Sequence, residues 1–87
     1  MSSMAANLED APTQGGADAE KLLQLGIIYS TGRSGPPDMV AAHKWFNIAG
    51  MRGSREAVRL RCEIASEMSS DQIAAAQRAA RTWLTRH

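Results

Sequence analysis

The sequence has very few residues suited to sulfur or imidazole chemistry. Its one cysteine is Cys62, and its two histidines are His43 and His87. A single cysteine cannot form a disulfide within the chain, and these three positions lack the short spacing that is typical of zinc ligands. We therefore expect no metal site and no cofactor, and the scarcity of cysteine fits a reducing compartment.

Long apolar runs are also missing. No stretch approaches the roughly 18 apolar residues of a membrane span, and no basic region followed by an apolar segment opens the chain. We expect no membrane span and a cytoplasmic location, for a whole protein or a piece of a longer one. Aromatic residues make up only 5% of the sequence, so the core should consist of closely packed Ala, Leu and Ile on helices.

Catalytic groups are not paired in the sequence. Asp38 and His43 are five residues apart, which places them on different sides of a helix, and neither has an indicated nucleophile. We interpret His43 as a surface or rim residue and Cys62 as a buried thiol in a helix. The sequence therefore does not predict an enzyme.

Charge is unevenly distributed, although the net charge is only +1. Residues 1–20 contain acids and no base, and all ten Lys and Arg follow. A basic surface can bind nucleic acid, but the spacing of Arg59 from Glu56 and Glu63 favours ion pairs within a helix and argues against it. The cluster of Arg55, Arg59 and Arg61 is instead a candidate site for an acidic segment of a partner protein.

Helical spacing runs through the chain after residue 16. Residues 1–16 have no periodicity and are expected to form a flexible leader. Four helical segments follow, with Gly32 as a left-handed stop, Asp38 as an N-cap, and Ser69 with Gln72 as a capping box. We predict an all-α fold of two stacked antiparallel helix hairpins, in which residues 17–87 form one domain divided into 17–53 and 54–87.

A set of small and aromatic residues at fixed offsets carries a family resemblance. These residues are Leu25, Gly26, Tyr29, Gly32, Asp38, Ala42, Trp45, Ala49, Gly53 and Ala57. In order and spacing they resemble the Sel1-like repeat, a relative of the tetratricopeptide repeat, with residues 17–53 as the full repeat. The resemblance implies a stack of helix hairpins that acts as an adaptor for protein partners, and many members of the family are bacterial.

Each matched residue also has a packing interpretation. Gly26 lets the second helix approach the first closely, and we expect Tyr29 and Trp45 to fill the space beside that crossing. In residues 54–87, the second unit, Cys62 takes the place of Gly26. The flank that is apolar in the first helix is charged in the corresponding helix of this unit. We interpret residues 54–87 as a divergent hairpin that caps the array, since terminal repeats present a polar outer face.

The candidate binding residues are those to which the repeat pattern assigns no packing role. Lys21, Gln24 and Ile28 form such a stripe on the first helix, and Ile28 is expected to be exposed. Together with the three arginines, this stripe is the candidate surface for an unidentified protein or peptide. The alternatives are a structural unit that forms a homodimer and, less favoured, a basic module that binds nucleic acid.

Overall fold

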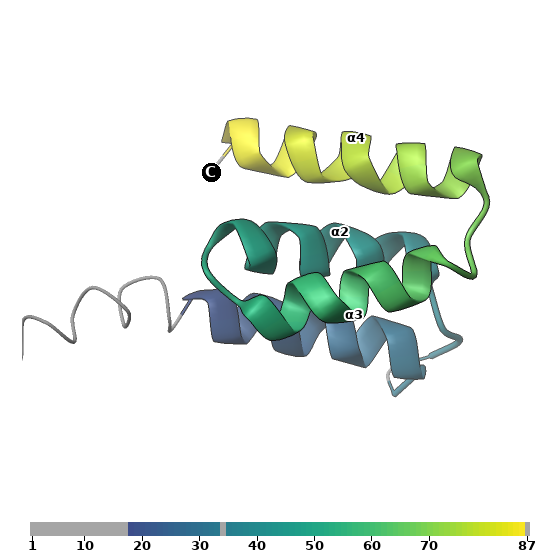
Figure 1. The fold of residues 1–87 in the computed structure, drawn as a ribbon, viewed down its shortest axis with the longest axis horizontal. Coiled ribbons are helices and arrows are strands. Elements are labelled where there is room, and N and C mark those ends of the chain that lie inside the picture. Colours follow the sequence, from purple (N-terminus) through teal and green to yellow (C-terminus); the bar gives the residue numbers. More distant parts are fainter. Residues whose placement is uncertain (1–17, 34, 87) are drawn as a thin grey trace, which may run out of the picture.

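The chain folds into helices joined by short turns (Figure 1). The structure is a computed structural model, and it describes residues 18–33 and 35–86. The described part of the first helix covers residues 18–31, and it is followed by α2 (Met39–Met51), α3 (Arg55–Ala65) and α4 (Ser70–Arg86). These residues contain no strand, which confirms the all-α prediction. The predicted leader, residues 1–16, lies outside the described residues.

The loop between the first helix and α2 is built as the sequence predicts. Gly32 has a positive φ of 75°, and its N–H donates to the carbonyl of Ile28 at 3.2 Å, which closes the helix end. The side chain of Asp38 accepts a hydrogen bond from the N–H of Ala41 at 3.0 Å. Asp38 is therefore the N-cap of α2, as expected.

Local caps also begin the last two helices. Ser54 accepts a hydrogen bond from the N–H of Ala57 at the start of α3. Ser69 and Gln72 bond reciprocally: the Ser69 N–H donates to Oε1 of Gln72 at 2.9 Å, and the Gln72 N–H donates to Oγ of Ser69 at 3.1 Å. This confirms the capping box and fixes the start of α4.

Helix α2 is the centre of the arrangement. Both α3 and α4 pack extensively against it, with α4 along one side of α2 and α3 along another (Figure 1). A helix with neighbours on several sides buries more than one of its faces. The buried residues of α2 are Ala42, His43, Phe46, Ile48 and Ala49.

The closest approach between helices joins Gly26 to Phe46. A Cβ placed on Gly26 would clash with Cδ1 and Cε1 of the Phe46 ring, which is only 1% exposed. The predicted close crossing at Gly26 is therefore confirmed, but the ring that lies over the glycine is Phe46. Trp45 points instead to α4, because adjacent residues on a helix face directions about 100° apart.

The sequence interpretations of His43 and Cys62 are wrong. His43 was expected at the surface or rim but is 1% exposed, because α2 is enclosed from more than one side. Cys62 was expected to be a buried thiol and is exposed. The core side of α3 passes through Ala57, Leu60 and Ile64, and a residue five positions after Ala57 falls on the opposite side. Cys62 is therefore not the counterpart of the buried Gly26.

Candidate binding groove

A groove lies between the middle of α2 and the C-terminal half of α4. It has a volume of about 300 Å³ and is lined by Lys44 from α2 and by Ala79, Thr82, Trp83 and Arg86 from α4. The four α4 residues follow the i, i+3, i+4, i+7 spacing of one helix face. We refer to it as the Trp83 groove.

An aromatic contact joins the two helices beside this groove. The rings of Trp45 and Trp83 meet edge to face, with their centroids 5.6 Å apart and their planes at 81°. Such contacts stabilise a pair by about 0.5–1.5 kcal/mol beyond the area that they bury. Through this contact the ring of Trp83 on α4 packs onto α2.

One cation lies over each of the two tryptophan rings. The ammonium of Lys44 lies 4.2 Å from the centroid of the Trp45 ring, and the guanidinium of Arg52 lies 5.6 Å from that of Trp83. Arg52 also forms an ion pair with Asp18 at 3.5 Å, which ties the start of the described chain to the end of α2. Neither Lys44 nor Arg86 forms an ion pair with a carboxylate among the residues that the structure describes.

A second groove follows the opposite flank of α4. It has a volume of about 430 Å³, and Met51 at its edge is 64% exposed. Its lining residues are Asn47, Met51, Gln77, Ala80, Arg81 and Leu84. We refer to it as the Met51 groove.

The predicted stripe on the first helix is only partly available. Lys21 and Gln24 are exposed, and Nε2 of Gln24 donates to Oε2 of Glu20 at 3.1 Å. Ile28 is partly buried rather than exposed, so it offers less apolar surface than expected. The stripe consists mainly of polar groups on a solvated helix face.

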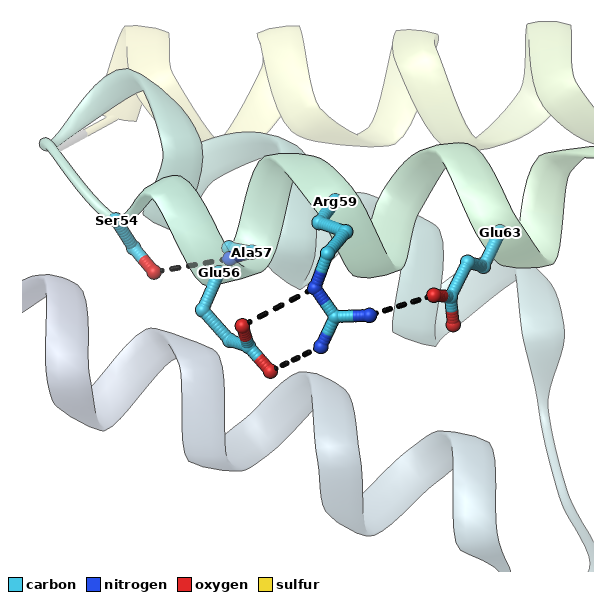
Figure 2. A network of polar contacts seen from close by, with 5 residues as sticks. All are labelled: Ser54, Glu56, Ala57, Arg59 and Glu63. Atoms are coloured by element: carbon cyan, nitrogen blue, oxygen red, sulfur yellow. Dashed lines mark hydrogen bonds and ion pairs between the residues drawn. The ribbon is translucent and has the colours of Figure 1, made fainter.

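The predicted arginine cluster is divided by the structure. Figure 2 shows Arg59 held between Glu56 and Glu63 along α3, with guanidinium–carboxylate distances of 2.5 and 2.6 Å. These bonds confirm the expected ion pairs, and the hydrogen bonding that Arg59 donates to the Glu56 carboxylate is the main cause that raises the pKa of Arg59. Arg55 is exposed near Arg59, whereas Arg61 is two residues further and lies about 200° around the helix. The three arginines therefore do not form one surface.

The buried histidine, His43 on α2, lies within the electrostatic reach of Arg61 on α3. Burial lowers the pKa of His43, and the positive charge of Arg61 lowers it further. Nδ1 of His43 finds no hydrogen-bond partner among the described residues. A neutral imidazole therefore packs between α2 and its neighbours, because charging it in this environment would cost free energy.

A membrane span or a metal site would each point to a function, and neither is present among residues 18–33 and 35–86. No helix among them is long and apolar enough to cross a bilayer. They also contain no group of three His, Cys, Asp or Glu side chains placed to hold a metal ion. Comparisons with models of known protein families, with curated proteins and with solved structures found no match.

Sequence reasoning missed the Trp83 groove. Lys44 is separated from Ala79, Thr82, Trp83 and Arg86 by more than thirty residues, so only the packing of α4 onto α2 brings them together. One signal was present in the sequence: Thr82, Trp83 and Arg86 share the helical spacing of Ala79. That spacing marks a face of α4, but it does not show which helix the face meets.

Proposed function

We propose that this chain is a protein–protein interaction module of the Sel1-like type, an adaptor without chemistry of its own. The observation that carries the proposal is the Trp83 groove, a concave apolar surface edged by cations on a helical scaffold. Its volume lies at the lower limit of small-molecule sites, which suits one or two side chains of a partner better than a cofactor. The resemblance to an adaptor family supports the same function.

The test is affinity capture with the full chain as bait, followed by mass spectrometry. Lys44→Glu alters the Trp83 groove, Lys21→Glu alters the stripe on the first helix, and Arg78→Glu is a matched control on the exposed side of α4. Partners held by the wild type and by Arg78→Glu but lost from Lys44→Glu would support both the function and the groove.

Two other results of the capture experiment have a clear meaning. Loss of partners only from Lys21→Glu would keep the adaptor function and move its site to the first helix. Failure of the wild-type chain to retain any partner above an unrelated helical bait would contradict the proposal. Far-ultraviolet circular dichroism of each variant separates lost binding from lost folding.

Self-association is the second candidate function. It is favoured by Met51, which is 64% exposed at the edge of the Met51 groove, together with Val58, which is 40% exposed. An exposed apolar side chain at a groove, such as Met51, is a candidate contact for a second copy of the chain. Sedimentation velocity over a hundredfold range of concentration should then show a dimer that Met51→Glu abolishes, whereas a concentration-independent monomer would exclude this function.

A further inference from the structure

The chemistry of the Trp83 groove indicates the kind of segment that it binds. Resting on the proposed function, we propose that the groove takes an acidic peptide segment with one bulky apolar side chain. The apolar side chain packs beside Trp83 and Ala79, and flanking carboxylates meet Lys44 and Arg86.

Charge complementarity is the first argument. Helices α2 and α4 together carry four bases and one acid, and the acid, Asp71, lies in the first turn of α4, far along the helix from Arg86. The bases are Lys44, Arg78, Arg81 and Arg86. On α3 the balance differs, because Glu56 and Glu63 are both engaged by Arg59. Helices α2 and α4 therefore have four bases against one acid, compared with three bases against two acids on α3, and two of those four bases, Lys44 and Arg86, line the groove.

The position of the cations is the second argument. The contact of Lys44 with the Trp45 ring holds its ammonium at the rim of the groove before any ligand arrives. Arg86 is exposed on α4, and its guanidinium can bind a carboxylate through two parallel N–H donors. A segment between the two helices can therefore meet a cation from each.

The arrangement of the two rings favours a peptide over single-stranded nucleic acid as the ligand. Protein sites for single-stranded nucleic acid also combine cations with aromatic side chains. Bases bind such surfaces by stacking on open ring faces. Here Lys44 covers a face of Trp45, Arg52 covers a face of Trp83, and the two rings meet edge to face. The ring surface left for stacking is small, whereas an aliphatic side chain needs only the apolar wall that the groove provides.

The experiment measures fluorescence anisotropy of labelled peptides with the full chain. The probe has the core Glu-Glu-Leu-Glu-Glu, one control peptide replaces each Glu by Lys, and another replaces Leu by Ala. We expect the Lys peptide not to bind and the Ala peptide to bind about fivefold more weakly. Arg86→Glu and Lys44→Glu should each weaken binding about threefold to tenfold, whereas Arg78→Glu should change it less than twofold.

Three outcomes would overturn the proposal: an acidic peptide that binds no better than the Lys peptide, equal losses in Arg86→Glu and Arg78→Glu, or tighter binding of a thymidine oligonucleotide with steep salt dependence. The proposed function fails separately. A captured partner that Lys44→Glu releases, together with no binding of the acidic peptide, would preserve the adaptor function and refute only the acidic ligand.

Discussion

Replacing Gly26 by alanine tests the closest contact between the helices. A Cβ at this position would clash with Cδ1 and Cε1 of the Phe46 ring. The ring is 1% exposed, so it cannot rotate into solvent to make room. The added methyl group must therefore move the first helix away from α2 or force Phe46 from its preferred rotamer.

Two opposing effects set the expected change in the free energy of unfolding of Gly26→Ala. Gly→Ala inside a helix stabilises by about 1 kcal/mol through backbone entropy and helix propensity. Overpacking a filled core costs about 1–3 kcal/mol, and the upper half of that range applies where the neighbour is an enclosed ring. Gly26→Ala should therefore lower the free energy of unfolding by about 1–2 kcal/mol, a fall in Tm of roughly 5–15 °C for a chain of this size.

Gly50→Ala is the matched control within the same chain. A Cβ on Gly50 would lie 2.7 Å from Cγ2 of Val58, a side chain that is 40% exposed and is therefore much less enclosed than the Phe46 ring. We expect Gly50→Ala to lower the free energy of unfolding less than Gly26→Ala does in urea titrations followed by circular dichroism. Phe46→Leu in the Gly26→Ala background should recover part of the loss, a coupling that a double-mutant cycle measures. A Gly26→Ala protein as stable as the wild type would refute this reasoning.

The remaining predictions concern charge and capping. Burial lowers the pKa of folded His43 below the 6.5 of an ordinary histidine, so the unfolded chain binds the proton first. The free energy of unfolding should therefore fall as pH drops from about 7.5 to 5.5, with a slope that flattens in His43→Gln; an unchanged slope would contradict this. Asp38→Ala should cost about 1 kcal/mol in urea titrations, whereas Asp38→Asn should retain most of the stability; equal losses would mean that the cap bond contributes little. Arg59→Ala should leave the unfolding midpoint nearly unchanged in high salt, because its ion pairs are exposed; a large drop would indicate contacts beyond α3.

The starts of α2 and α4 could be predicted because their causes are local. Asp38, Ser69 and Gln72 bond to backbone groups within three residues, so short sequence patterns specify them. Gly32 stops the first helix through its own positive φ. Such features need no knowledge of which helices meet, and this is why the all-helical prediction was confirmed.

Which neighbouring helix each side of α2 contacts could not be predicted in the same way. Trp45 and Phe46 are adjacent and both are large enough to fill a core, and the sequence does not state which neighbour each one meets. The answer depends on α4 lying against one side of α2 while the first helix crosses another, a relationship between distant segments. The burial of His43 and the Trp83 groove depend on the same relationship.

The edge-to-face pair of Trp45 and Trp83 has a spectroscopic consequence. They are the only two tryptophans in the sequence, one on α2 and one on α4. Two indoles held at a fixed angle and short distance should couple electronically and give a signed signal in the aromatic region of the circular dichroism spectrum. Backbone ellipticity follows all helices together, whereas this signal follows only the docking of α4 on α2. The chain thus has an intrinsic optical reporter that distinguishes detachment of its last helix from loss of the whole fold.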